Sequence, residues 1–130
     1  MGAIADEVAR CGGKHIGIIP RFMKDFLHPG LTEIVWTDTM AERKEKMREG
    51  TYAAIALPGG IGTLDELIET LTLAKLDIYQ GKIFAFNCFG FFNPLIELLD
   101  YYVKTGMLDE RSRALIEFPD TVEELIGHLN

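Results

Sequence analysis

The chain has 130 residues, of which 48% are hydrophobic, so it is long enough for one domain with one core and too short for two ordinary domains. Its formal net charge of -7 excludes a non-specific grip on nucleic acid or anionic lipid, because both need a surplus of Lys and Arg facing the phosphates. Cys11 and Cys88 have neither CxxC nor Cys/His spacing, which excludes a disulfide framework or a zinc site and fits a reducing cytosol. With no signal-peptide pattern and no membrane-spanning apolar run, we expect one cytoplasmic domain over residues 1–130.

The predicted elements alternate between helices and short strands. The first helix, Gly2 to Cys11, should end at the two glycines that follow it, because glycine supplies the left-handed geometry that stops helices. Short β-branched or aromatic runs bounded by turn residues predict buried strands at residues 15–20, 33–38, 52–57 and 82–88. Apolar residues at three- and four-residue spacing predict helices at residues 40–49, 63–76 and 94–105, and a last strand and helix are expected at 114–119 and 121–129.

This alternation predicts an α/β fold. Parallel neighbouring strands need a crossover connection, and a helix is the usual crossover. We therefore expect a Rossmann-like three-layer sandwich with a mainly parallel sheet and helices on its faces. The longest irregular stretch, residues 21–32, contains a His-Pro-Gly turn and is expected to form a loop over the site.

The most informative segment runs from Leu57 to Glu66, where an apolar strand is predicted to end and an amphipathic helix to begin. Parallel sheets bind ligands at this edge. Three glycines, Gly59, Gly60 and Gly62, let the backbone turn tightly and come close to a ligand. The unpaired N–H groups and the positive end of the helix favour a phosphate, so the sequence predicts an anion site here.

Helix capping is the alternative interpretation of the same segment. Thr63 and Glu66 have the spacing of a capping box, in which the hydroxyl and the carboxylate satisfy only the helix's own N–H groups. The same Thr-x-x-Glu spacing recurs in two other pairs, Thr39/Glu42 and Thr121/Glu124. The spacing alone is therefore uninformative, and the preceding Pro-Gly-Gly-x-Gly favours phosphate binding over simple helix entry.

Two motifs in this order resemble a known family. The run Pro58-Gly-Gly-Ile-Gly-Thr-Leu-Asp-Glu66 resembles the PGGxGTxxE signature of the Lonely Guy (LOG) family, and Met40-Ala-Glu-Arg-Lys44 resembles its upstream motif. The resemblance covers nearly all of the chain. It implies a cytokinin riboside 5'-monophosphate phosphoribohydrolase, which hydrolyses the N-glycosidic bond of purine nucleoside 5'-monophosphates to a free base and ribose 5-phosphate. Many bacterial members also accept AMP, some carry a mistaken lysine decarboxylase label, and no organic cofactor is implied.

The resemblance begins after the family's first strand, helix and strand. Met1-Gly2 looks like the end of the family's glycine-rich GLMG segment, which belongs to the nucleotide site. We therefore expect the fold to lack these first elements and to leave a sheet edge uncovered, which favours pairing with another chain. The resemblance also implies a homodimer whose sites lie near the interface.

Arg43 and Glu66 are the catalytic residues that the resemblance implies. Arg43 shares a helix face with Met40 and Met47, so its guanidinium is expected on an apolar stripe that turns inward. Three roles are open for the guanidinium there: it binds an anionic ligand, it pairs with a structural carboxylate, or it extends to water. The match to the family's essential Arg favours the first role, in which Arg43 holds the nucleotide. Glu66 matches the family's catalytic Glu. In that role, a carboxylate near C1' stabilises the positive charge that develops on the ribose as the C1'–N bond breaks, and it orients or deprotonates the attacking water.

The remaining candidates are assigned in groups. The two motifs imply substrate-binding positions at Met40, Lys44, Gly59, Gly60, Ile61, Gly62 and Thr63. Lys44 is also expected to be solvated, and Asp65 and Glu69 to be charges on the helix surface. No metal site is predicted, since unrelated spacings favour structural or surface roles for His15, His28 and His128. Core packing is favoured over base stacking, with any excess facing a dimer partner, for Phe84, Phe86, Phe89, Phe91 and Phe92.

Two functions of other classes stay open. One is a non-catalytic nucleotide or molybdenum-cofactor carrier, and the other is an oligomerising scaffold. The presence of both Arg43 and Glu66 favours the enzyme, whereas the absent first elements favour a binder or an inactive fragment.

Overall fold

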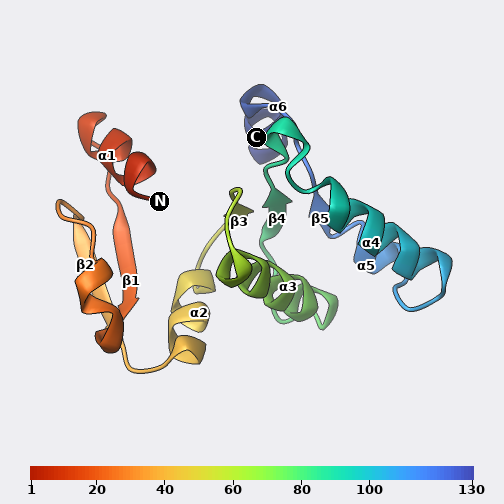
Figure 1. Cartoon of the computed structure of the whole chain (residues 1–130), viewed down its shortest axis with the longest axis horizontal. Coiled ribbons are helices and arrows are strands. Elements are labelled where there is room, and N and C mark those ends of the chain that lie inside the picture. The colour runs from red at the N-terminus through yellow and green to blue at the C-terminus, as the bar shows by residue number, and fades with distance from the viewer. The chain divides into compact units, whose positions relative to one another are not determined.

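A computed structural model of the protein describes residues 1–130, which form two compact units, Met1–Glu49 and Gly50–Asn130 (Figure 1). Each unit has its own parallel sheet, and each is described by itself below. The assignment of one domain to residues 1–130 stays a prediction. None of the helices has the length and the apolar content that crossing a membrane requires.

The first unit is a pair of parallel strands with helical connections. In chain order its elements are α1 (Gly2–Arg10), β1 (Ile16–Pro20), the 3₁₀ helix η1 (Arg21–Phe26), β2 (Glu33–Thr37) and α2 (Met40–Arg48). Strands β1 and β2 are parallel and pair from Ile16 opposite Glu33 to Pro20 opposite Thr37. Figure 1 shows the two strands side by side as red and orange arrows. The stretch predicted as an irregular loop therefore begins with η1, which connects the two strands.

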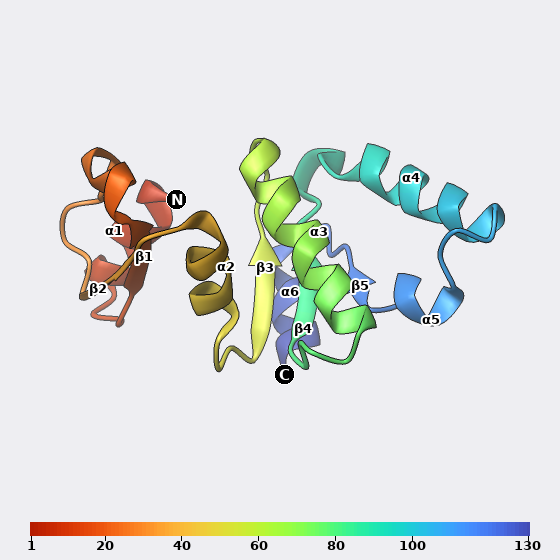
Figure 2. The same ribbon diagram turned by 90° about the horizontal axis from the view of Figure 1, so that it is seen from below.

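The second unit is a three-stranded parallel sheet of order β3-β4-β5. Its strands and helices are β3 (Ala53–Ala56), α3 (Ile61–Lys75), β4 (Lys82–Ala85), the 3₁₀ helix η2 (Cys88–Gly90), α4 (Asn93–Lys104), α5 (Glu110–Arg113), β5 (Ile116–Glu117) and α6 (Val122–Leu129). Figure 2 shows α3 running across β3 and β4. The carboxyl ends of these strands therefore meet the starts of the helices that follow them, which is where α/β sheets bind ligands.

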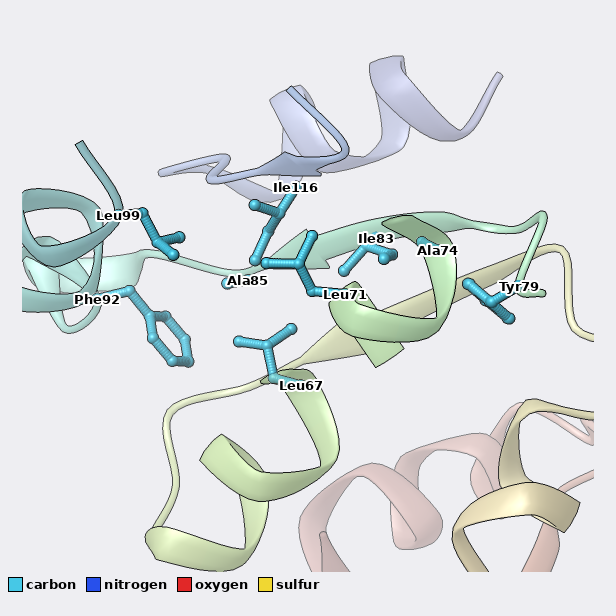
Figure 3. Packing of buried hydrophobic residues seen from close by; sticks show 9 residues of the cluster. All are labelled: Leu67, Leu71, Ala74, Tyr79, Ile83, Ala85, Phe92, Leu99 and Ile116. Atoms are coloured by element: carbon cyan, nitrogen blue, oxygen red, sulfur yellow. The ribbon is translucent and has the colours of Figure 1, made fainter. Parts of the chain in front are cut away.

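The core of the second unit lies on one face of this sheet. Because successive strand residues point to opposite faces, Ile83 and Ala85 of β4 face α3 and α4, where they join Leu67, Leu71 and Leu99 in one buried cluster (Figure 3). Phe84, which is fully buried, points to the other face, and its ring meets the His128 ring of α6 at 6.1 Å. Helices thus cover both faces of the sheet, and the unit has three layers.

The predicted α/β class with parallel strands is confirmed, and the strands form two sheets. The predicted helices and strands are present, with small shifts at their ends. The strand expected at residues 82–88 ends at Ala85, because a 3₁₀ helix follows it, and the short helix α5 was not predicted. In α1 the expected glycine stop is present, since Gly12 has a φ of +69° directly after the cap residue Cys11.

Candidate functional site: the glycine loop and the start of α3

The glycine loop joins the end of β3 to the start of α3. Helix α3 begins at Ile61, with the extended residue Gly60 as its N-cap, and no side chain caps it. Thr63 is therefore the third residue of the helix and not its N-cap. The capping-box interpretation of Thr63 and Glu66 is wrong, because the helix starts three residues earlier than that interpretation requires.

The other two Thr-x-x-Glu pairs cap their helices, and each Glu accepts the N–H of the residue before the N-cap. At α2 the Thr39 hydroxyl accepts a hydrogen bond from the Glu42 N–H at 3.1 Å, and the Glu42 carboxylate accepts one from the Asp38 N–H at 2.8 Å. At α6 the Thr121 hydroxyl accepts a hydrogen bond from the Glu124 N–H at 3.2 Å, and the Glu124 carboxylate accepts one from the Asp120 N–H at 2.9 Å. A Thr side chain thus satisfies one N–H group in the first turn of each of these two helices, whereas α3 has no side-chain cap.

An uncapped helix start attracts anions. The first N–H groups of a helix have no acceptor inside the helix, and the aligned peptide dipoles place roughly half a positive charge at this end. In α3, a helix of 15 residues, this end follows a parallel strand and carries the exposed residues Gly60, Ile61 and Gly62. The start of α3 therefore has the geometry that binds a phosphate group.

The glycines act here through space and not through unusual backbone angles. None of the three has a positive φ, so the expected tight glycine turn is not what requires them. At Gly59 an added Cβ would lie 2.3 Å from the Thr63 hydroxyl oxygen, so glycine lets the loop pack against Thr63. At Gly60 and Gly62 an added Cβ would meet nothing within 4 Å, which leaves open space beside the helix start.

Glu66 lies in the second turn of α3, about 7.5 Å along the helix axis from Ile61. Its side chain is half-buried, and its carbonyl oxygen accepts a hydrogen bond from the Thr70 hydroxyl at 2.7 Å. The next residue, Leu67, is 4% exposed and belongs to the core, which fixes this turn of the helix. Of the neighbouring carboxylates expected on the helix surface, Asp65 is exposed and Glu69 is half-buried.

Arg43 is tethered to the first unit's sheet. Its Nε donates a hydrogen bond to the carbonyl oxygen of Ile18 in β1 at 3.1 Å, and the side chain is half-buried. The expected inward apolar stripe is wrong, because Met40 and Met47 are 38% and 37% exposed and α2 has no buried residue. Lys44, expected to be solvated, is half-buried. Arg43 is thus oriented by a backbone acceptor and not by an apolar pocket.

The predicted site residues divide between the two units. Met40, Arg43 and Lys44 lie together on α2 of the first unit. The second unit brings together the start of α3 and its second turn, with Gly59, Gly60, Ile61, Gly62, Thr63 and Glu66. The convergence of the two groups on one ligand stays a prediction.

Asn87 is a buried polar residue that sequence reasoning missed. It follows β4, is 5% exposed, and its amide nitrogen donates to the Asn93 and Asp120 side-chain oxygens at 2.9 and 2.8 Å. Its amide oxygen accepts the N–H of Phe92 at 2.7 Å. The side chain therefore ties the end of β4 to the start of α4 and to the turn before α6. The available signal was a polar Asn within the apolar run predicted as the strand at residues 82–88.

The phenylalanines after β4 are only partly in the core. Phe84 and Phe92 are 0% and 5% exposed, as core packing predicts. Phe89 and Phe91 are 105% and 49% exposed, so the core assignment is wrong for these two. Phe89 also has a φ of +56°, an uncommon backbone conformation for a residue with a side chain.

The histidines have local partners. His15 contacts the Thr32 hydroxyl at 3.1 Å, His28 lies 3.2 Å from the Asp6 carboxylate, and His128 is paired with Glu117. No group of three His, Cys, Asp or Glu side chains is placed to hold a metal ion. The chemistry offered by the described groups is therefore that of backbone N–H donors, a carboxylate and a guanidinium.

Parallel strands joined by helices, with a glycine loop leading into an uncapped helix, define a Rossmann-like α/β protein. A family model described as "Possible lysine decarboxylase" matches residues 1–129, and the chain belongs to this family. The chain is 36% identical over 132 residues to the rice (Oryza sativa subsp. japonica) "Probable cytokinin riboside 5'-monophosphate phosphoribohydrolase LOGL2", covering 99% of this chain and 54% of that protein.

Two further relatives confirm the resemblance to the LOG family. The Arabidopsis thaliana "Cytokinin riboside 5'-monophosphate phosphoribohydrolase LOG3" is 35% identical over 99% of this chain and 61% of its own length. A protein of Mycobacterium tuberculosis with the name "Cytokinin riboside 5'-monophosphate phosphoribohydrolase" is 33% identical over 97% of this chain and 68% of its own length. The chain thus spans between about half and two thirds of the length of these relatives.

Proposed function

We propose that this chain hydrolyses the N-glycosidic bond of purine nucleoside 5'-monophosphates to a free base and ribose 5-phosphate. The observation that carries the proposal is the start of α3, where the chain caps two other Thr-x-x-Glu helices itself but leaves this one without a side-chain cap. The names of the relatives agree with it, since they act on cytokinin riboside 5'-monophosphates.

In the proposed mechanism the 5'-phosphate binds the N–H groups at the start of α3. The open space beside Gly60 and Gly62 lets the phosphate approach the backbone. Ile61 and Thr63 contribute their N–H groups from the same turn. The helix dipole stabilises the phosphate charge without any lysine in the loop, which suits a chain of net charge -7.

Glu66 provides the carboxylate for bond cleavage. As the C1'–N bond breaks, its electron pair leaves with the base and positive charge develops on the ribose. The carboxylate stabilises this charge and orients a water molecule, whose oxygen bonds to C1' and whose proton ends on the departing base. The position of Glu66, about 7.5 Å beyond the helix start, suits a ribose attached to a phosphate at the loop.

Arg43 positions the nucleotide in this proposal. Its Nε bond to the Ile18 carbonyl fixes the plane of the guanidinium, whose two Nη atoms carry four further N–H donors. Met40 and Lys44, on the same helix, complete the substrate-binding group of the first unit. The proposal further includes AMP among the substrates, a cytoplasmic location, a homodimer and no cofactor.

The test is chromatographic detection of free base after incubation of the purified chain with AMP and with isopentenyladenosine monophosphate, alongside a binding titration. We expect release of base that is lost in Arg43→Ala and in Glu66→Gln, with Asp65→Asn as a matched carboxylate control that retains it. Binding without release would overturn hydrolysis and favour a carrier of nucleotides or molybdenum cofactor. If the chain neither binds the nucleotides nor releases base, the result would favour the oligomerising scaffold.

A further inference from the structure

The turn between β4 and α4 is fixed by the side-chain amide of Asn87. The side chain is buried, and its amide nitrogen donates to the side-chain oxygens of Asn93 and Asp120 at 2.9 and 2.8 Å. Its amide oxygen accepts the N–H of Phe92 at 2.7 Å. Because all three bonds come from one planar group, they hold the turn in a single arrangement.

Gly90 is suited to this network. Its φ is +70°, a conformation that favours glycine, and its N–H donates to the Asn87 carbonyl oxygen at 2.9 Å. A Cβ at this position would lie 2.7 Å from the Asn93 amide nitrogen. A side chain at position 90 would therefore displace the Asn93 amide that Asn87 binds.

The network holds Phe92 in the core of the second unit. Phe92 is the N-cap residue of α4, and its backbone N–H is the group that Asn87 binds. Its ring belongs to the same buried cluster as Leu67, and Figure 3 shows the two side chains next to each other. Leu67 directly follows Glu66 in α3. One backbone hydrogen bond and one packed ring thus connect Asn87 to the turn that carries Glu66.

Phe92 also borders the glycine loop. It lines a groove of about 450 Å³ together with Gly59, Gly60 and Thr63, and Figure 2 shows the starts of α3 and α4 at the same end of the sheet. Glycines lose more conformational freedom on folding than other residues, and no side chain caps α3. The order of this helix start therefore depends on the packing around it.

We infer that Asn87 is a positioning residue for the proposed phosphate site, because through Phe92 it holds the start of α3 in the conformation that binds the anion. Asn87 itself touches no substrate in this assignment. Donors that are already in place bind an anion without the cost of ordering them, so loss of the network lowers affinity. The part of the inference that concerns the anion rests on the proposed function, and the link from Asn87 to α3 does not.

The test compares a broken network with a restored one. Asn87→Asp keeps an oxygen for the Phe92 N–H, but it loses both donors and sets a carboxylate beside that of Asp120. Adding Asp120→Asn returns an amide donor at that contact, and the Asn93 amide can turn its nitrogen toward the new carboxylate. The double variant has the net charge of the unmodified chain. Recovery in the double variant would therefore distinguish the network from the position of a charge.

Two measurements follow the start of α3. Amide hydrogen exchange at Leu64, whose N–H donates to the Gly60 carbonyl oxygen at 3.3 Å, reports local opening of the first turn without any nucleotide. Titration with AMP measures the affinity of the site. We expect Asn87→Asp to speed exchange at Leu64 and to raise the Kd for AMP, each on the order of 10-fold, and the double variant to reverse both changes.

Ser112→Ala is the matched control at the other end of α3. Ser112 is 4% exposed, and its hydroxyl donates to the Asp109 carboxylate at 2.7 Å, which lies 3.8 Å from the Nζ of Lys75, the last residue of α3. This variant also removes a buried polar hydrogen bond from the second unit. It should lower Tm and keep both the exchange rate at Leu64 and the Kd for AMP. Equal changes in Ser112→Ala would overturn the inference, because a general loss of stability would then explain them.

Asn93→Ala decides the question if Asn87→Asp does not fold. Asn93 is exposed, and its replacement removes one acceptor of the Asn87 amide, so we expect the same two changes at smaller size. Unchanged exchange at Leu64 in the folded variant, or a double variant that restores neither measurement, would overturn the inference. An unmodified chain that does not bind AMP would overturn the proposed function, whereas exchange at Leu64 would still decide whether Asn87 holds the start of α3.

Discussion

The start of α3 and the starts of α2 and α6 share the spacing Thr-x-x-Glu, yet they are built differently. At α2 and α6 the Thr is the N-cap and the Glu returns to the preceding backbone N–H. At α3 the helix starts three residues earlier relative to the Thr, directly after Gly60, so Thr63 and Glu66 lie inside it. The comparison teaches that the residues before such a motif decide whether its Thr caps the helix or lies inside it.

The largest expected effect is on kcat for base release, and it should distinguish Glu66 from Glu124. Glu66→Gln should lower kcat for base release by on the order of 100- to 10,000-fold, because the carboxylate acts on the ribose in the proposed mechanism. Glu124→Gln should keep kcat. The measurements are steady-state kinetics and thermal unfolding of both variants. A normal kcat in Glu66→Gln would remove the carboxylate from the mechanism.

The glycines should separate packing from ligand access. Gly59→Ala places a Cβ 2.3 Å from the Thr63 hydroxyl and should lower the free energy of unfolding by about 1–3 kcal/mol. Gly62→Ala meets open space inside α3, so it should raise the free energy of unfolding by up to about 1 kcal/mol and weaken AMP binding. Urea unfolding measures the free energy of unfolding of each variant, and titration with AMP measures its affinity for the nucleotide. Equal destabilisation by the two changes would contradict the steric account.

The threonines should show the difference between a cap and a helix residue. Thr121→Ala removes the hydroxyl that accepts the Glu124 N–H and should lower the free energy of unfolding by about 1 kcal/mol. Thr63→Ala removes no cap and should cost less stability. Urea unfolding of the two variants decides, and a larger loss in Thr63→Ala would mean that α3 depends on Thr63 for its start.

The smallest effect concerns a cap that titrates. Asp109 caps α5, and the hydrogen bonds from the Ser112 N–H and hydroxyl to its carboxylate lower its pKa below the ordinary 3.8. A folded-state pKa below the unfolded value contributes stability that is present above the unfolded pKa and is lost as pH falls through the folded one. Asp109→Asn should therefore narrow the difference in Tm between neutral and strongly acidic pH. If Tm depends on pH identically in the variant and in the unmodified chain, the Asp109 carboxylate makes no such contribution to stability.

The fold was predictable where local pattern decides it. Apolar spacing and glycine stops located α1 to α4 and α6 because these features depend on neighbours in sequence. The four-residue helix α5 is too short to show a period, and the early start of α3 was missed because glycines are poor helix formers. The division into two sheets depends on pairing between distant segments, which no local pattern encodes.

The sequence indicated which residues form the glycine loop, but it did not indicate their contacts. Gly59 was identified, but the reason for it, the approach of Thr63, is a matter of packing. The hydrogen bond from Arg43 to Ile18 joins residues 25 positions apart, so the periodicity of a single helix or strand could not predict it. The exposure of Phe89 and Phe91 follows from the backbone between β4 and α4, whereas composition only predicts that aromatic residues are buried.

The amide of Asn87 limits which residues position 87 tolerates. A planar group with two donors and one acceptor on a short stem is found only in Asn, because Gln is longer by one carbon and Asp has no amide donors. Asp would also set a second carboxylate beside that of Asp120, and Leu would leave the N–H of Phe92 without its acceptor. In a library of all substitutions at position 87 selected for folding, Asn should be enriched over every other residue.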